Sequence, residues 1–212
     1  HDLRTPVRHV MSFADLAQKA LTSAPNEKVG RNLKVIKQAA ERMSSLIDGM
    51  LVLSRTSRAE LSSHSVDLNL LVAQARQDVG SEFVHRPVHW QIQPLPQVWG
   101  DPRMLQSVLT NLIRNAVKYS STREVSRISI WAQEQDTEWL ISVQDNGVGF
   151  DPKYSDRLFG VFQRLHHERD FEGIGVGLAT VRRIVLKHGG QVFVEGQPEQ
   201  GATFGFTLPK RG

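Results

Sequence analysis

Cysteine is absent from this 212-residue chain. Its absence excludes disulfides, thiolate metal sites and cysteine nucleophiles, and it permits a reducing compartment. The sequence also has no apolar run near the ~20 residues that a membrane-spanning helix needs, and no signal peptide at its start. We therefore expect a cytoplasmic chain that makes no membrane contact of its own.

A dense run of lysine and arginine with interleaved aromatic residues is missing as well, which argues against nucleic-acid binding. The formal net charge of +4 is mild and suits phosphates or an acidic partner surface. With 40% hydrophobic and 23% charged residues, the chain can form real cores, and its length suits two small domains. Because it begins at His1 without a methionine, we expect a fragment of a longer protein, either membrane-anchored or soluble.

The first sixty residues have the period of helices. Apolar or small residues recur in steps of four and three from Leu3 to Leu21 and again from Val29 to Met50, with a turn signal at Ser23–Asn26 between them. This pattern predicts an all-α antiparallel hairpin over residues 1–60. One apolar seam on two helices stays half uncovered, which favours a homodimer joined as a four-helix bundle. Alternatively, the hairpin packs on the rest of its own chain.

The period changes after the polar stretch Ser54–Arg58. Asp101 and Pro102 form an N-cap signal for a helix that reaches about Tyr119. Helices are expected over Leu68–Val79, Pro102–Tyr119 and Gly177–His188, and strands over Ser65–Asp67, Val88–Gln93, Ser126–Gln133, Glu138–Gln144, Gln191–Glu195 and Ala202–Leu208. Residues 61–212 are thus predicted to form an α/β sandwich with a mixed, mostly antiparallel sheet and helices on one face.

A polar face on the helix before Tyr119 is the first candidate binding feature. Asn111, Asn115 and Lys118 share this face at spacings of four and three. The carbonyl oxygen of Asn115 suits Mg²⁺, an ion that takes few protein ligands and keeps water and phosphate oxygens. A solvated helix face would give the same pattern.

The segment Asp145–Phe150 follows directly on a predicted strand. Its glycines allow a tight turn close to a ligand. An ionised aspartate only accepts hydrogen bonds, so Asp145 would accept from an exocyclic amine such as that of adenine. The sequence Asp-Asn-Gly is equally typical of a hairpin turn.

A third segment, Gly173–Leu178, precedes the predicted helix at Gly177. Closely spaced glycines expose amide N–H groups, and a helix N-terminus adds partial positive charge, so this segment favours phosphate. It lacks the Lys-Ser/Thr ending of a Walker loop and does not follow a strand as a Rossmann turn does. The charged stretch Arg164–Glu172 before it is expected to act as a lid.

These segments, in this order, resemble the two-component sensor histidine kinases, whose ATP-binding fold is shared with gyrase, Hsp90 and MutL. The resemblance covers nearly the whole chain. The matching segments are His1–Pro6, similar to the phosphoacceptor box, Asn111–Tyr119 to the asparagine box, Asp145–Phe150 and Gly173–Leu178 to two glycine boxes, and Leu158–Phe162 to the phenylalanine box. Phe162–His166 is also similar to kinases of the phytochrome type. Phe159 and Phe162, three apart on an expected short helix, are predicted to be core anchors.

The resemblance implies a phosphoryl acceptor at the start of the chain. By position, His1 would be phosphorylated, Asp2 would act as its neighbouring acid or base, and Thr5 would orient water for dephosphorylation of the partner. A neutral imidazole nitrogen is nucleophilic near pH 7, and an adjacent carboxylate can accept its proton. The implied partners are a second copy of the chain and a response regulator receiver domain.

The resemblance also implies ATP and Mg²⁺ as cofactors. Asn115 would bind the metal, Lys118 would meet phosphate, and Asp145 would accept the adenine amino group. The remaining residues that it places around the nucleotide are Asn111, Tyr119, Gly147, Gly149, Gly173, Gly175, Gly177 and Leu178. In-line positioning and charge neutralisation are what phosphoryl transfer mainly requires.

The expected function is that of an ATP-dependent, autophosphorylating protein histidine kinase that passes its phosphoryl group to an aspartate of a response regulator. Two alternatives stay open. The first is a phosphatase-dominated or inactive scaffold that binds the regulator. The second is a gyrase- or Hsp90-like ATPase that forms no phosphohistidine.

Overall fold

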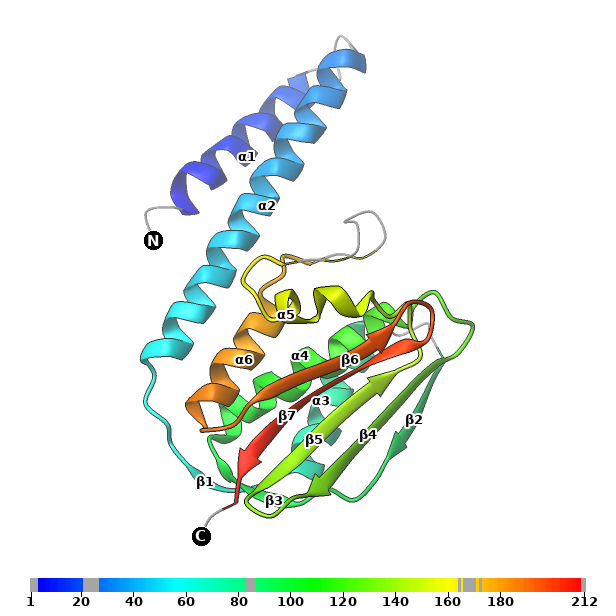
Figure 1. Ribbon diagram of the computed structural model, residues 1–212. Coiled ribbons are helices and arrows are strands. Elements are labelled where there is room, and N and C mark those ends of the chain that lie inside the picture. The colour runs from blue at the N-terminus through cyan, green and yellow to red at the C-terminus, as the bar shows by residue number, and fades with distance from the viewer. Residues whose placement is uncertain are drawn as a thin grey trace. The chain divides into compact units, whose positions relative to one another are not determined.

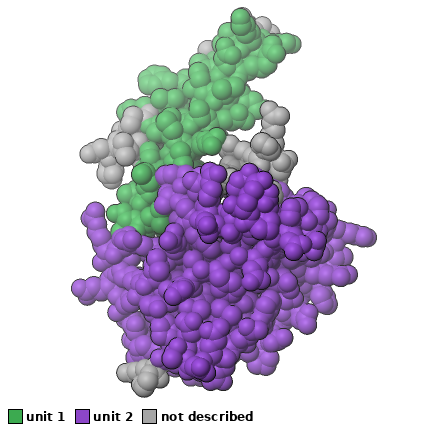
Figure 2. Space-filling model, in the orientation of Figure 1, with its two compact units in different colours: residues 1–54 green, residues 55–212 purple. Residues whose placement is uncertain are grey.

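The computed structural model describes residues 4–20, 27–82, 87–163, 165, 171 and 173–210, without the side chains of residues 4–6, 20 and 82. The chain divides into two compact units, residues 1–54 and 55–212 (Figure 2). In the described ranges, no helix combines the length and the apolar character that crossing a bilayer requires.

The first unit is built on two helices, α1 (Arg4–Ala20) and α2 (Glu27–Arg58), which lie side by side as the predicted hairpin (Figure 1). The predicted turn at residues 23–26 lies outside the described residues. Lys37 Nζ donates to Asp15 Oδ1 at 2.9 Å and so joins the two helices. α2 ends at Arg58, at the end of the polar stretch after which the sequence period changes.

Among the described residues of the hairpin, only a few small ones are buried. Val7 and Ala14 on α1 and Ala40 on α2 are buried. Several large apolar side chains are instead exposed, among them Phe13 at 71% and Val35 at 62%. A single hairpin therefore leaves much of its apolar surface uncovered.

The second unit is an α/β sandwich, as predicted. Its main sheet has five strands in the order β2-β4-β5-β7-β6, in which only the β2–β4 pair is parallel. Helices α3, α4 and α6 cover one face of this sheet (Figure 1). The main-sheet strands are β2 (Val88–Ile92), β4 (Ser126–Glu134), β5 (Glu138–Asp145), β6 (Val192–Gln197) and β7 (Gly201–Pro209). The helices are α3 (Leu68–Glu82), α4 (Pro102–Tyr119), α6 (Gly177–Lys187) and two short turns, η2 (Pro152–Tyr154) and α5 (Ser155–Leu158).

The core of the second unit lies between the sheet and the helices. Strand register places Ile130 beside Val143, and Val143 beside Phe204, so that alternate residues form apolar rows across the sheet. These rows meet the apolar faces of α4 and α6, where Leu112 and Ile184 are almost fully buried. The alternation of apolar and polar residues along the strands thus determines which face of the sheet the helices cover.

Two features of this unit differ from expectation. Strand β3 (Gln97–Gly100), which pairs antiparallel with β1 (His64–Asp67), was not predicted. The helix expected to carry Phe159 and Phe162 ends at Leu158, and Phe162 adopts a φ of 61°. Phe159 is buried against Phe204, with ring centroids 6.4 Å apart, whereas Phe162 is exposed, so its prediction as a core anchor is wrong.

Candidate nucleotide-binding site

Helix α4 is fixed at its first turn by Asp101. Oδ1 of Asp101 accepts the backbone N–H groups of Arg103 at 3.0 Å and Met104 at 3.1 Å, and Pro102 occupies the first helical position. Oδ2 accepts the N–H of Ser62 at 3.1 Å. Burial alone would raise the pKa of Asp101, but these N–H donors outweigh it and lower the pKa. The helix that carries the asparagine face is therefore anchored by an ionised cap.

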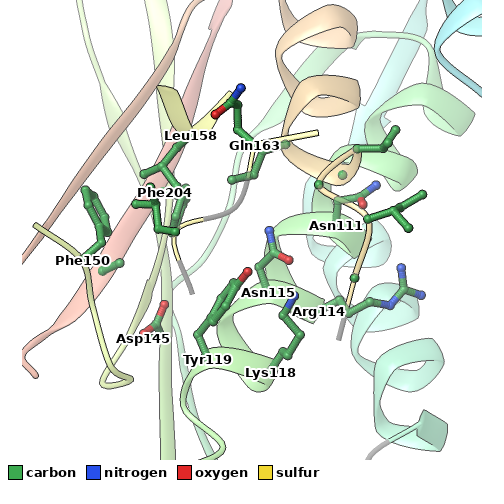
Figure 3. A pocket seen from close by; sticks show the side chains of 18 of the residues that line it. Asn111, Arg114, Asn115, Lys118, Tyr119, Asp145, Phe150, Leu158, Gln163 and Phe204 are labelled. Carbon is green, nitrogen blue, oxygen red and sulfur yellow. The ribbon is translucent and has the colours of Figure 1, made fainter. Parts of the chain in front are cut away.

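A cavity of about 270 Å³ opens beside α4 (Figure 3). All the nucleotide-site residues expected from the sequence except Gly147 line it. Its lining consists of Asn111, Arg114, Asn115, Lys118, Tyr119, Asp145, Gly149, Phe150, Leu158, Gln163, Leu165, Gly173, Ile174, Gly175, Val176, Gly177, Leu178, Ala202 and Phe204. Segments as far apart in the sequence as Asn111 and Phe204 thus converge on one space.

One end of the cavity holds the carboxylate of Asp145 at the end of β5. Its side chain is almost fully buried, and its Oδ1 accepts the N–H of Gly147 at 2.8 Å. Burial raises the pKa of Asp145 to about 6, although hydrogen bonds from the backbone of Gly147 and Ala202 act against this shift. A carboxyl group whose charged form is disfavoured by burial, yet which lines a cavity, is a candidate for a binding role.

The turn after Asp145 is too crowded for side chains. A Cβ atom at Gly147 would lie 2.4 Å from the carbonyl oxygen of Tyr119, and one at Gly149 would lie 1.9 Å from that of Gln197. Gly149 also has a φ of 60°, which glycine adopts readily. Gly147 therefore allows the turn to pack against the backbone of Tyr119 without lining the cavity, whereas Gly149 lines it.

The other end of the cavity carries the polar face of α4. Nδ2 of Asn111 donates to the carbonyl of Ser107 at 2.8 Å, which directs its Oδ1 toward Gly177. Arg114 and Lys118 bring two cationic groups to the same stretch (Figure 3). Nζ of Lys118 lies 4.3 Å from the ring centroid of Tyr119. This end is therefore positively charged and polar.

The glycine segment before α6 closes the cavity. Gly175 has a φ of 73°, and its carbonyl accepts the N–H of Phe162 at 2.9 Å, which ties this segment to the turn after α5. Helix α6 begins at Gly177, and the side chain of Val176 at its N-cap makes no capping hydrogen bond. The first N–H groups of an uncapped helix suit an anionic ligand.

Sequence reasoning missed several residues that the fold brings to the cavity. Arg114 follows Asn111 by three residues, so the same helical spacing indicates its position. Phe150 and Phe204 form an aromatic wall beside Asp145, with ring centroids 6.3 Å apart. Phe204 comes from a distant strand, and no local pattern marks it.

The expected acceptor residues are not part of this described site. His1 and Asp2 lie outside the described residues. Thr5 belongs to α1, and its side chain is not described. Their roles rest on the sequence alone.

The two ends of the cavity differ in character. One end has a buried carboxylate beside aromatic rings, and the other has cations and glycine N–H groups. This arrangement suits a ligand that has a polar base and a chain of anionic groups. The class of protein that this site and sandwich define is a nucleotide-binding α/β domain. Residues 100–212 match the family described as "Histidine kinase-, DNA gyrase B-, and HSP90-like ATPase", and residues 1–58 match the "His Kinase A (phospho-acceptor) domain". The chain belongs to this family and has the domain order of two-component sensor histidine kinases.

Individual relatives agree with this membership. The chain is 32% identical to cyanobacterial phytochrome A of Nostoc sp. over 212 residues, 100% of the chain and 28% of that relative. It is 30% identical to the phytochrome-like protein Cph1 of Synechocystis sp. over 99% of the chain and 28% of the relative. The solved structure of full-length ShkA in complex with AMPPNP is similar with a TM-score of 0.69 and 27% identity, over 100% of this chain and 45% of that one. The chain thus spans under a third of the length of these two phytochrome relatives.

Proposed function

We propose that this chain is the catalytic part of an autophosphorylating protein histidine kinase that acts in two-component signalling, in the cytoplasm where ATP is available. Residues 1–60 would form the dimerisation and phosphotransfer domain, and residues 61–212 the ATP-binding domain. The observation that carries this proposal is one cavity lined by a buried carboxylate at one end and by cationic side chains at the other, on a chain whose first 58 residues match a phospho-acceptor domain.

The polarity of the cavity fits one orientation of ATP. The adenine amino group would donate to Asp145, with the ring between the aromatic side chains and Tyr119. The phosphates would lie toward Lys118, Arg114 and the N–H groups of the glycine segment that ends at Gly177. Lys118 would neutralise one phosphate charge beside the glycine segment, since a Cβ atom at Gly173 would lie 3.4 Å from its Nζ.

The residues present also fit Mg²⁺. Among the described residues, no three histidine, aspartate or glutamate side chains cluster as a metal site, so a dedicated protein cage is not offered there. Asn115 lines the phosphate half of the cavity and has a neutral carbonyl oxygen. It would hold the ion together with triphosphate oxygens and water, which is how magnesium commonly binds with nucleotides. The ion would supply charge neutralisation at the phosphates.

In the proposed reaction, a ring nitrogen of His1 attacks the γ-phosphorus. The bond between that phosphorus and the oxygen of ADP breaks as the phosphorus–nitrogen bond forms, and Asp2 accepts the proton of the ring. The phosphohistidine would then pass its phosphoryl group to an aspartate carboxylate of a response regulator receiver domain. Thr5 would orient water when the partner is dephosphorylated.

The apolar surface of the hairpin supports the homodimer. Phe13, Leu16 and Val35 are exposed on helices that have few buried side chains among the described residues, and a four-helix bundle would cover such apolar surface. Sedimentation analysis should therefore show a dimer, and Val35→Asp should shift it toward monomer. A wild-type chain that stays monomeric at micromolar concentration would contradict the proposed bundle.

Incubation with γ-labelled ATP tests the kinase activity directly. We expect an acid-labile, base-stable label on a peptide that contains His1, and its loss in His1→Gln. Steady phosphate release that survives His1→Gln without any covalent label would instead support a gyrase-like ATPase. Nucleotide binding with neither label nor turnover would support a scaffold that binds the regulator.

A further inference from the structure

Arg123, in the segment between α4 and β4, contacts the turn that follows Asp145. Its Nε donates to the carbonyl oxygen of Asn146 at 2.9 Å, and its Nη2 donates to that of Gly147 at 2.9 Å. Nη2 also donates to the carbonyl oxygen of Glu199 at 2.7 Å. One guanidinium thus serves three backbone carbonyls, which its planar arrangement of donors allows.

These contacts join two turns, the one that follows Asp145 and the one between β6 and β7. Glu199, in the turn between β6 and β7, has a φ of 61°, and its N–H donates to the carbonyl of Val148 at 2.7 Å. Arg123 therefore holds the same pair of turns that this backbone hydrogen bond joins. The arginine side chain is 30% exposed, while the Glu199 side chain with which it forms an ion pair is 73% exposed. The contacts with the carbonyl oxygens of Asn146 and Gly147 are partly buried and are the sheltered part of this arrangement.

The Asn146–Gly147 peptide group links Arg123 to the binding carboxylate. Its carbonyl oxygen accepts from Arg123, and its N–H donates to Asp145 Oδ1 at 2.8 Å. The guanidinium therefore fixes the plane of the peptide whose N–H orients the carboxylate. A charged donor at the carbonyl also polarises the N–H and strengthens its hydrogen bond.

We infer that Arg123 is a positioning residue for base recognition, which holds the Asn146–Gly147 peptide so that the Asp145 carboxylate faces the exocyclic amino group of adenine. This inference rests on the proposed ATP site and deepens it. It predicts that Arg123 acts on selectivity for the base, beyond any effect on folding.

The test compares binding of ADP and of inosine diphosphate, whose base carries a carbonyl oxygen in place of the amino group, by calorimetry on the full chain. The wild type should prefer ADP by about tenfold or more, because a hydrogen bond to a charged group is worth about that factor. Arg123→Gln should remove most of this preference through weaker ADP binding, with inosine diphosphate affinity changed less than about threefold. Glu199→Gln is the matched control: it removes only the exposed ion pair and should leave both affinities unchanged.

The other outcomes separate the role of Arg123 from the existence of the nucleotide site. An equal loss of both affinities in Arg123→Gln, or a preference that persists, overturns the positioning role while leaving the nucleotide site intact. A wild type without preference for ADP overturns the proposed base recognition itself. If Arg123→Gln does not fold, Arg123→Lys decides, because an ammonium keeps the charge but lacks the planar fork, so the preference for ADP should still fall. A wild-type preference in Arg123→Lys would then overturn the inference.

Discussion

The side-chain oxygen of Asn111 lies directly against Gly177, where a Cβ atom would sit 2.7 Å from that oxygen. This contact joins the asparagine face of α4 to the first residue of α6. Because the Nδ2 atom of Asn111 is already bonded to the carbonyl of Ser107, the amide has a fixed direction in the cavity. Glycine at this position leaves room for that oxygen, and backbone conformation does not demand it, since Gly177 has no positive φ.

Gly177→Ala should therefore weaken nucleotide binding without unfolding the domain. The added methyl group displaces the end of a flexible side chain, while alanine favours a helix more than glycine does. We expect ADP affinity to fall by about five- to tenfold, with an unchanged or higher melting temperature. Calorimetry and thermal unfolding measure the two effects separately.

Gly80→Ala provides the matched control on another helix. A Cβ atom at Gly80 on α3 would meet nothing within 4 Å. This substitution should raise the free energy of unfolding by about 0.5–1 kcal/mol and leave ADP affinity unchanged. If both variants bind ADP as the wild type does, the Asn111 contact has no role in the site.

Asp145→Asn should stabilise the nucleotide-free chain while it weakens binding. Burial raises the pKa of this carboxyl from 3.8 to about 6, so the folded chain binds more protons than the unfolded chain between these values. Stability therefore falls as the pH rises through this window. The asparagine avoids this cost, and at pH 7.5 we expect a gain of up to about 3 kcal/mol in the free energy of unfolding.

The pH dependence is the decisive measurement for this variant. Urea denaturation at several pH values should show the gain above pH 6 and its disappearance near pH 4. ADP affinity at pH 7.5 should drop by about tenfold or more, since the asparagine has lost the charge that accepts from the amino group. A stability difference between the variant and the wild type that is the same at pH 4 and at pH 7.5 would show that Asp145 carries no burial cost.

Asn115→Ala tests the proposed magnesium ligand. The loss of its carbonyl oxygen should lower ATP affinity by about tenfold or more when Mg²⁺ is present. In excess chelator, the wild type and the variant should bind ATP with similar affinity, because the contribution through the ion is then absent from both. Equal affinities in the presence of Mg²⁺ would remove Asn115 from the metal site.

Local signals in the sequence were sufficient for the elements that carry the site. Asp101 and Pro102 mark the start of α4, and the helical period of its apolar face gives its direction, so the relation of Asn115 to Lys118 followed directly. Strand β3 lacked such a signal, because its four residues are defined by pairing with a strand more than thirty residues earlier. The helices, the hairpin and the mixed sheet were predictable from period together with cap and turn signals and the order of the elements.

The finer geometry of the site required tertiary contacts. The spacing of glycines indicates a tight turn but does not distinguish Gly149, which lines the cavity, from Gly147, which is pressed against the carbonyl of Tyr119. Arg123 belongs to no motif, and its three carbonyl partners come from two separate turns. Phe162 took a turn conformation because its N–H bonds to Gly175, a partner beyond the reach of helical periodicity.

Asp101→Ala should destabilise the second unit. It removes the side-chain oxygens that cap α4 and accept the N–H of Ser62, while the backbone N–H of residue 101, which donates to Nε2 of His188 at 3.0 Å, is kept. An N-cap loss costs about 0.5–2 kcal/mol and a lost hydrogen bond about 1 kcal/mol more. We expect a loss of about 2 kcal/mol in the free energy of unfolding by urea, with an unchanged m-value.

Asp101→Asn separates the cap from the charge. Asparagine caps helices nearly as well as aspartate, so this variant should keep most of the stability at pH 7. Since the pKa of Asp101 is lowered in the folded chain, the contribution of its charge is present above the ordinary pKa of 3.8 and is lost as the pH falls through the folded value. The wild type should therefore lose its advantage over Asp101→Asn on acidification.

Asp136→Ala is the control for both variants. It removes an exposed loop carboxylate and should change the free energy of unfolding by less than about 0.5 kcal/mol. Equal losses for Asp101→Ala and Asp136→Ala would mean that the cap contributes nothing to the helix that presents the nucleotide site.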